Sequence, residues 1–257
     1  MVVLVSTRNP LNIGAAARAM SNLGFLRLRV VNPYEASFRE ARSAVGAAPV
    51  LAGAEEYKTV ADAVVDCSLV VGTTAARNRE LHHPLKLLQE GAPILRKHLR
   101  SGRVALLFGS EKRGLSNADL SHCHWLLHIP TRAEHVSMNL GQAVAVCLYE
   151  LARDSSMERP AAGKKVGQQK REKPVRRSDR DNLQQLASPH APAAAGDLER
   201  ITSLLLEALG LSGYLGTRSV AKEDKVRRMV RRLDIPARDA ESWLGMLRQI
   251  VWKLGNR

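Results

Sequence analysis

Four short polar segments contain the residues most able to do chemistry, and each follows a brief apolar run. In the first, Asn9 to Arg18, Asn and Gly tolerate unusual backbone angles, and the small residues let a helix begin close to a sheet. The N-terminus of such a helix binds anions, and Arg18 would share a helix face with Gly14. The same pattern is also consistent with an ordinary turn that carries a solvated arginine.

The second and third segments would place small polar groups at the carboxyl ends of strands. Val71 to Ala75 ends an apolar run with two threonines, and open α/β sheets bind ligands outside the carboxyl ends of their strands. Leu106 to Ser116 presents Glu111 between Gly109 and Gly114, next to two cations. A surface loop with a local ion pair would look similar, but polar residues in a glycine-bounded loop after a buried strand are often functional.

The fourth segment begins as an apolar run, Leu127 to Thr131, and continues into Ser137 to Val146. Its polar residues Ser137 and Asn139 precede an apolar helical stretch, so helix capping is one interpretation of them. A functional loop at the end of a strand is the other interpretation.

The apolar runs within residues 1–153 predict a parallel α/β sheet. Short continuous apolar runs suit strands that are buried on both faces, and helical stretches alternate with them. We expect strands over residues 2–5, 28–31, 69–72, 104–108 and 126–129, and helices over residues 14–23, 85–99 and 140–151.

Two further regions follow this domain. Residues 154–196 are rich in Lys, Arg, Gln, Pro and Ala and have few large apolar side chains, which predicts a basic flexible linker. Residues 197–257 show apolar side chains at helical spacing and predict a small all-helical domain. Its stripes run over residues 198–209, closed by Gly210, over 226–233, ended by Pro236, and over 243–254.

The charge of the chain indicates a polyanionic partner. The 257 residues have a formal net charge of +14, which suits nucleic acid or an anionic membrane surface. No apolar run approaches the roughly 20 residues that span a bilayer, so we expect no membrane association. Cys67, Cys123 and Cys147 are widely spaced and form neither a metal-ligand pair nor a disulfide framework. We therefore expect a cytoplasmic protein with buried, reduced cysteines.

Together and in this order, the four polar segments resemble the signature of the SPOUT superfamily, in its TrmH-like branch of RNA 2′-O-methyltransferases. Within that branch the chain is similar to the TrmJ-type tRNA (cytidine/uridine-2′-O)-methyltransferases, which modify an anticodon-loop ribose. The resemblance is strong over residues 1–153 and extends to 198–209 and 225–248. It implies a SPOUT-type parallel sheet with a C-terminal trefoil knot, which is a rare topology, and a homodimer.

The resemblance also implies roles for individual residues. Arg18 corresponds to the arginine that activates the ribose hydroxyl, and Asn12 to the asparagine paired with it. Glu111 corresponds to the acid of the second family motif, and Ser137 and Asn139 to the polar pair of the third. The knot loops that form the cofactor pocket would be residues 72–75, 108–114 and 129–140. Within them S-adenosyl-L-methionine would be held, largely by backbone groups, at Thr73, Thr74, Ala75, Gly109, Ile129, Val136, Ser137 and Met138.

The implied chemistry leaves the role of Arg18 open. A ribose hydroxyl is a poor nucleophile and needs a base or electrostatic help. Arginine side chains normally stay protonated, so Arg18 acts either as a base in an unusual site or as a cation that stabilises the developing alkoxide. The donor carries a sulfonium charge, so the resemblance implies no metal.

Three alternatives to tRNA ribose methylation are considered. An enzyme of the same fold that acts on ribosomal RNA shares all four segments, and only the C-terminal helices favour the tRNA group, by analogy. A non-catalytic RNA-binding protein would be favoured if Arg18, Glu111 or Asn139 were replaced, but all are present. A generic nucleotide-binding domain lacks support, because neither glycine-rich nucleotide motif occurs.

The basic tail is expected to add RNA affinity without adding chemistry. Its cations lie in Lys164 to Arg180 and in the cluster of Arg227, Arg228, Arg231 and Arg232, where they would leave one helix face basic. Phosphate contacts of this kind are independent of sequence and sensitive to salt. A solvated charged surface is the plainer interpretation.

Overall fold

A single parallel sheet forms the centre of the larger domain. The computed structural model describes residues 1–34, 48–75, 80–153, 191–216 and 219–256. The seven strands run in the order β3-β2-β1-β6-β4-β7-β5, and each neighbouring pair is parallel. They are β1 Val2–Val5, β2 Leu28–Val31, β3 Glu55–Tyr57, β4 Leu69–Thr73, β5 Leu85–Leu87, β6 Val104–Phe108 and β7 Trp125–His128.

The strands at the centre of the sheet were predicted correctly from the sequence, whereas the two edge strands were not. The expected strands 2–5, 28–31 and 104–108 are β1, β2 and β6, which are buried along their whole length, as strands covered on both faces should be. The apolar pattern does not indicate β3. The helix expected from residue 85 is wrong at its start, because β5 lies there and α5 (Leu88–Ser101) begins only at Leu88. Both β3 and β5 are edge strands of three residues with partly or largely exposed side chains, so they lack the apolar signal on which the prediction depends.

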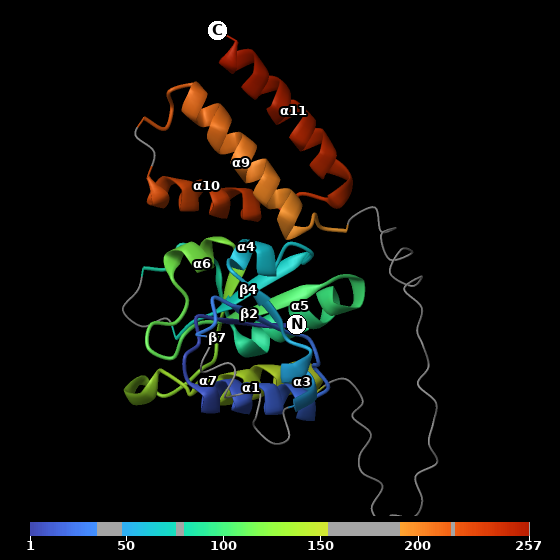
Figure 1. The fold of residues 1–257 in the computed structure, drawn as a ribbon, viewed down its shortest axis with the longest axis vertical. Helices are drawn as coiled ribbons and strands as arrows, with labels where there is room; N and C mark the ends of the chain where they lie inside the picture. Colours follow the sequence, from blue (N-terminus) through green and yellow to red (C-terminus); the bar gives the residue numbers. More distant parts are fainter. Residues whose placement is uncertain (35–47, 76–79, 154–190, 217–218, 257) are drawn as a thin grey trace, which may run out of the picture.

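Helices cover both faces of the sheet (Figure 1). Side chains of α1 Pro10–Asn22, α3 Ala48–Ala52, α5 Leu88–Ser101 and α7 Leu140–Ala152 share one buried apolar cluster with the strands. Side chains of α4 Val60–Ala63 and α6 Asn117–Ser121 share the cluster on the other face. The fold is therefore a three-layer α/β arrangement, as the alternation of strands and helices predicts.

Three helices form a separate C-terminal module, with α9 Ala195–Leu211, α10 Val220–Arg232 and α11 Ala237–Gly255. Its core includes Leu198, Ile201, Val230, Leu244 and Leu247, which belong to the three expected stripes. The boundary expected at residue 196 falls inside α9, and α9 continues through Gly210 instead of ending there. Most of the expected linker, residues 154–190, lies outside the described residues.

The module lies against the α4 and α6 side of the sheet domain (Figure 1). The backbone N–H groups of Ala195 and Gly196 donate to the carbonyl oxygens of Cys67 and Val65, at 2.7 and 3.0 Å. A Cβ on Gly196 would lie 2.7 Å from Val65 Cγ2, so a larger residue at this position would push the module away. No helix within the described residues is long and apolar enough to cross a membrane. The trefoil knot stays a prediction of the resemblance.

Candidate active site

The four polar segments meet at one edge of the sheet. They follow β1, β4, β6 and β7 in the chain, and these strands are successive neighbours in the order β1-β6-β4-β7. Because the strands are parallel, their carboxyl ends lie on the same edge. The loops that leave this edge are therefore brought together although they are far apart in the sequence, as ligand sites of open α/β sheets usually are.

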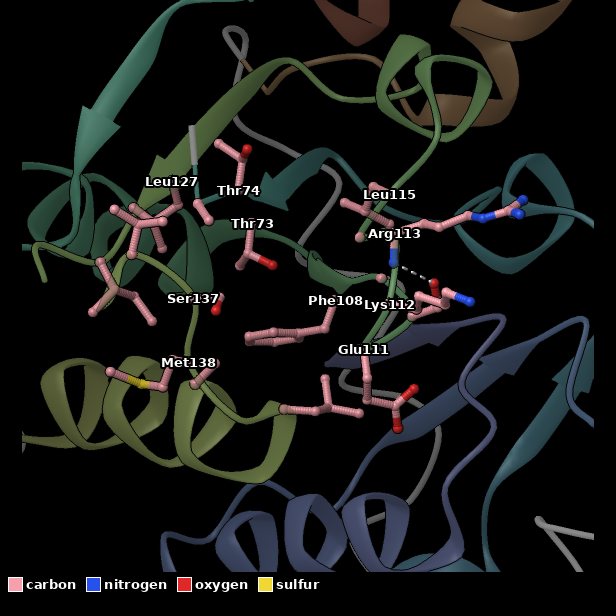
Figure 2. A pocket seen from close by; sticks show the side chains of 18 of the residues that line it. Thr73, Thr74, Phe108, Glu111, Lys112, Arg113, Leu115, Leu127, Ser137 and Met138 are labelled. Atoms are coloured by element: carbon pink, nitrogen blue, oxygen red, sulfur yellow. Dashed lines mark hydrogen bonds between the residues drawn. The ribbon is translucent and has the colours of Figure 1, made fainter. Parts of the chain in front are cut away.

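A pocket of about 400 Å³ opens among three of these loops (Figure 2). This volume lies within the usual range of roughly 300–1,000 Å³ for small-molecule sites. All eight residues expected to hold the cofactor line it, namely Thr73, Thr74, Ala75, Gly109, Ile129, Val136, Ser137 and Met138. The lining also includes Phe108, Ser110, Thr131 and Leu140, which lie within the loops 108–114 and 129–140 implied by the resemblance but are not among the eight residues assigned to the cofactor.

One wall of the pocket is a tight loop over residues 109–115. The N–H of Gly114 donates to the carbonyl of Ser110 at 2.8 Å, and the N–H of Arg113 lies 3.4 Å from Ser110 Oγ. Gly114 has a φ of +66°, which favours glycine. At Gly109 an added Cβ would lie 2.1 Å from the carbonyl carbon of Gly114 and 2.2 Å from the nitrogen of Leu115. Only glycine fits there, because the two ends of the loop are in contact.

The opposite wall is built from the ends of β4 and β7. Thr73 Oγ1 donates to the carbonyl of Leu107 at 2.8 Å, and the N–H of Thr74 donates to the carbonyl of Leu127 at 3.0 Å. His128 Nδ1 lies 3.1 Å from the carbonyl of Thr74. These bonds tie the threonine segment to both neighbouring strands, so that part of the pocket is fixed by the sheet.

A chain of hydrogen bonds joins three of the expected catalytic residues beside the pocket. Asn12 Nδ2 donates to Glu111 Oε1 at 2.9 Å, and Asn139 Nδ2 donates to Asn12 Oδ1 at 2.8 Å. Asn139 Oδ1 then accepts from the N–H of Gly141 at 2.9 Å at the start of α7. A carboxylate only accepts, so Glu111 sets the orientation of the Asn12 amide, and Asn12 that of Asn139.

Glu111 extends toward the beginning of α1, whereas Lys112 and Arg113 point away from the pocket centre (Figure 2). Partial burial raises the pKa of Glu111, but hydrogen bonds from Asn12 and from the N–H groups of Glu111, Arg8 and Asn9 outweigh it. The net result is a pKa below the usual value. Glu111 thus places a negative charge of the chain itself at the start of α1, where the sequence predicts an anion site.

The structure separates Ser137, Asn139 and Arg18. Ser137 lines the pocket, whereas Asn139 is the N-cap of α7, so the capping interpretation holds for Asn139 and not for Ser137. Arg18 is exposed on α1 and does not line the pocket of its own chain. Within one chain, the structure thus brings Asn12, Glu111, Ser137 and Asn139 to the pocket or its rim, and leaves Arg18 apart.

The cysteines have no chemistry to offer this site. Cys67, Cys123 and Cys147 are free and buried, and burial raises the pKa of each thiol to about 12, so they are not thiolate nucleophiles at neutral pH. Cys123 instead packs in the core against β4, where a Cβ on Gly72 would lie 2.9 Å from its Sγ. Among the described residues, no group of three or more His, Cys, Asp or Glu could hold a metal ion.

Comparisons of the chain with known proteins agree on one family, which consists of RNA methylases. The model of the SpoU rRNA methylase family matches residues 1–149. The tRNA (cytidine/uridine/adenosine-2′-O-)-methyltransferase TrmJ of Pseudomonas aeruginosa (strain UCBPP-PA14) is 43% identical over 152 residues, which are 58% of this chain and 59% of that protein. The tRNA (cytidine/uridine-2′-O-)-methyltransferase TrmJ of Yersinia pestis (strain Pestoides F) is 32% identical over 251 residues, covering 97% and 89%.

A solved structure extends the likeness to the C-terminal module. The crystal structure of TrmJ from Z. mobilis ZM4 superposes with a TM-score of 0.74 at 28% identity, over 97% of each chain. The resemblance drawn from the four polar segments is thereby confirmed, and the chain belongs to the SpoU rRNA methylase family.

Proposed function

We propose that this protein transfers a methyl group from S-adenosyl-L-methionine to a ribose 2′-hydroxyl of tRNA, in the anticodon loop. The observation that carries the proposal is the convergence of three polar segments on one pocket, with the fourth joined to its rim by the Glu111–Asn12–Asn139 hydrogen bonds. The relatives from Pseudomonas aeruginosa and Yersinia pestis, named for 2′-O-methylation of tRNA, support the choice of substrate.

The pocket residues fit the proposed cofactor. The lining combines apolar side chains such as Phe108 and Met138 with the hydroxyls of Thr73 and Ser137, which suits a ligand with an aromatic base and polar ends. Gly109 leaves the loop backbone close to the cavity without a side chain. The eight residues expected from the sequence would hold the ligand. When bound, S-adenosyl-L-methionine supplies a methyl group activated by a sulfonium, so the acceptor oxygen must lose its proton.

The remaining site residues act on the acceptor in this proposal. Glu111 and Asn139 hold the Asn12 amide from both sides, and Asn12 in turn helps to orient the ribose. Ser137 offers a hydroxyl inside the pocket. Arg18 activates the ribose hydroxyl, either by accepting its proton or by stabilising the alkoxide as a cation.

Arg18 can take that role if two chains form a dimer. It is exposed and lies outside the pocket of its own chain, so we propose that it completes the pocket of a partner. The neighbouring surface of α1 and α7 offers Leu11, Val146 and Tyr149 with 80%, 37% and 58% exposure, as an apolar interface would. Two-fold dimers are the commonest soluble oligomers. Sedimentation at micromolar concentration should give a dimer, and a species of 28 kDa alone would contradict it.

Ribosomal RNA is the second candidate substrate, because the matching family is described as one of rRNA methylases. Mass spectrometry of tRNA and rRNA from cells with and without the gene would distinguish the two. We expect one ribose methylation in the tRNA anticodon loop to disappear and the rRNA to be unchanged. Loss of an rRNA methylation alone would replace the proposal by the second candidate. We place this activity in the cytoplasm, whose reducing conditions suit the three free cysteines.

A further inference from the structure

A network of buried charges lies where the C-terminal module meets the sheet domain. Arg227 of α10 donates from Nε to both carboxylate oxygens of Glu199 in α9, at 3.0 and 3.2 Å. Arg231 donates from Nη2 to Glu199 at 3.2 Å and from Nη1 to the carbonyl of Ala195 at 3.2 Å. The network crosses to α6, because Arg227 Nη1 lies 3.2 Å from Ser121 Oγ and His122 lies 3.5 Å from Glu199.

This network is more than surface charge. The side chain of Arg231 is 1% exposed, that of Arg227 is 16% exposed, and Ser121 is fully buried. Burial raises the pKa of Glu199, but His122 and the two arginines outweigh burial and bring the pKa to about 2. Glu199 therefore stays ionised, and it accepts hydrogen bonds from both arginines with defined geometry.

Such a network gives orientation more than stability. Buried ion pairs add little compared with apolar packing, and their best-supported benefit is a fixed geometry. Apolar packing between the C-terminal module and the sheet domain is incomplete, because a cavity of about 460 Å³ lies among α4, α9 and α11 and reaches Glu199. Arg231 ties α10 to α9 through Glu199 and Ala195, and Arg227 also reaches the sheet domain through Ser121 Oγ.

The same helix places its other two arginines differently. Arg228 and Arg232 are four residues apart, take no part in the network, and have no ion pair within the described part of the chain. They lie close to His83, whose pKa is lowered to about 4, first by burial and then by the charges of these arginines. Helix α10 packs against α6, and the N-cap of α6, Ser116, directly follows the pocket-lining residue Leu115. The expectation that all four arginines form one RNA-binding face is thus wrong for Arg227 and Arg231.

We propose that Glu199, Arg227 and Arg231 form an orienting lock, which holds α10 so that Arg228 and Arg232 bind phosphates of the RNA whose ribose enters the pocket. Arg227 and Arg231 are positioning residues, and Arg228 and Arg232 are the contacting residues. This inference rests on the proposed function for the identity of the RNA. It differs from a general basic tail because it assigns opposite roles to neighbouring arginines of one helix.

The contacting pair is tested by its salt dependence. Equilibrium binding of tRNA to the full chain would be measured between 50 and 200 mM salt. For Arg228→Gln with Arg232→Gln, the slope of log affinity against log salt should become shallower by about 1.4 to 1.8, the value for two phosphates. The control Arg200→Gln with Arg238→Gln removes the same charge from exposed positions on α9 and α11 and should leave the slope unchanged. An unchanged slope in the contacting pair would overturn the proposal.

The lock is tested by a double-mutant cycle. Arg227→Gln should weaken tRNA binding about fivefold or more while calorimetry gives the same affinity for S-adenosyl-L-methionine. Combined with the contacting pair, it should cost no further tRNA affinity, because its effect passes through Arg228 and Arg232. Losses that multiply would mean a merely structural role and would refute the lock.

Two controls keep the outcomes distinct. If Arg227→Gln does not fold, Ser121→Ala removes the hydrogen bond between Arg227 and the sheet domain. Combined with the contacting pair, it should likewise cost no further tRNA affinity. A wild-type chain that binds tRNA but does not methylate it would refute the proposed function and leave the lock testable by binding. A chain that binds no tRNA refutes both.

Discussion

Asn12 is the middle residue of the hydrogen-bonded series Glu111–Asn12–Asn139, and replacing it by Asp turns its donor to Glu111 into an acceptor. The substitution changes one amide nitrogen to oxygen and leaves the shape of the side chain nearly intact. In the native chain, Asn12 Nδ2 donates to Glu111 Oε1 at 2.9 Å. In Asn12→Asp two carboxylates would face each other at that distance, and one of them must hold a proton or be repelled.

The magnitude follows from the lost bond and the new repulsion. A hydrogen bond to a charged group contributes about 1.5–3 kcal/mol, and the low end applies because Glu111 is exposed. Repulsion between two charges about 4 Å apart in a water-like medium adds about 1 kcal/mol. We therefore expect a loss of about 2–3 kcal/mol in the free energy of unfolding at pH 7.5, or about 5–10 °C in Tm.

The sign of the pH dependence separates this mechanism from a packing defect. The new carboxyl in Asn12→Asp would have a folded-state pKa raised above its unfolded value of about 3.9, so its destabilising effect is absent below that pH and grows as pH rises through the raised pKa. The wild type behaves oppositely, because the pKa of Glu111 is lowered and its contribution is lost as pH falls.

Urea unfolding of both proteins between pH 4.5 and 7.5 is the measurement. The loss in free energy of unfolding caused by Asn12→Asp should become smaller toward pH 4.5. The loss caused by Asn12→Ala should change much less with pH, because alanine adds no carboxyl group. A deficit of Asn12→Asp that is constant across this range would mean that Asn12 and Glu111 are not in contact in solution.

Four further predictions concern the proposed site. Arg18→Ala should abolish turnover and leave cofactor affinity within a few-fold, and Arg18→Lys should also fail because it loses the planar guanidinium; turnover in Arg18→Ala would contradict both proposed roles. Gly109→Ala should abolish cofactor binding in calorimetry, since its Cβ would lie 2.1 Å from the loop backbone. Glu111→Gln, which still accepts from Asn12, should retain more turnover than Glu111→Ala, and equal loss would indicate a proton-transfer role. Truncation after Arg153 should leave a folded, cofactor-binding dimer with weaker, less salt-dependent tRNA binding; undiminished tRNA binding would refute this role of the module.

The central architecture and the pocket could be predicted because their signals are local. Each pocket segment follows an apolar run that ends in Gly, Thr or Pro, so the strand and its loop are visible together, as at Val71 to Ala75. The short edge strand Glu55–Tyr57 was missed because its side chains are largely exposed, and the sheet partner that makes it a strand is distant in the chain. For Phe108 the apolar pattern alone indicates core, and the family resemblance is what implies its pocket loop, because the end of a strand can belong to both.

The lock could not be predicted because its pairing is tertiary. The spacing of Asp224 and Arg227 is compatible with a local helix pair, and that pair is present at 3.1 Å. Nothing in the spacing indicates that Glu199, 28 residues from Arg227, takes two arginines out of the basic face. Four neighbouring arginines on a helix therefore look equivalent in sequence until the adjacent helix is placed.

The hydrogen bonds among Glu111, Asn12 and Asn139 also limit which group can accept the ribose proton in the proposed reaction. A general base works best when its pKa lies near the operating pH, but the hydrogen bonds to Glu111 lower its pKa below the ordinary range of a glutamate. Its Oε1 is further engaged by the Asn12 amide. Glu111 is thus suited to hold Asn12 in one orientation and poorly suited to remove a proton. Asn12 and Asn139 have amide side chains, which do not titrate, so the proposed reaction assigns activation of the ribose hydroxyl to Arg18 of a partner chain and not to these three residues. For this reason the dimer and the chemistry stand together in the proposal: within one chain, the described Glu111–Asn12–Asn139 hydrogen bonds supply an orienting acid, and Arg18 of a second chain supplies the group that activates the acceptor.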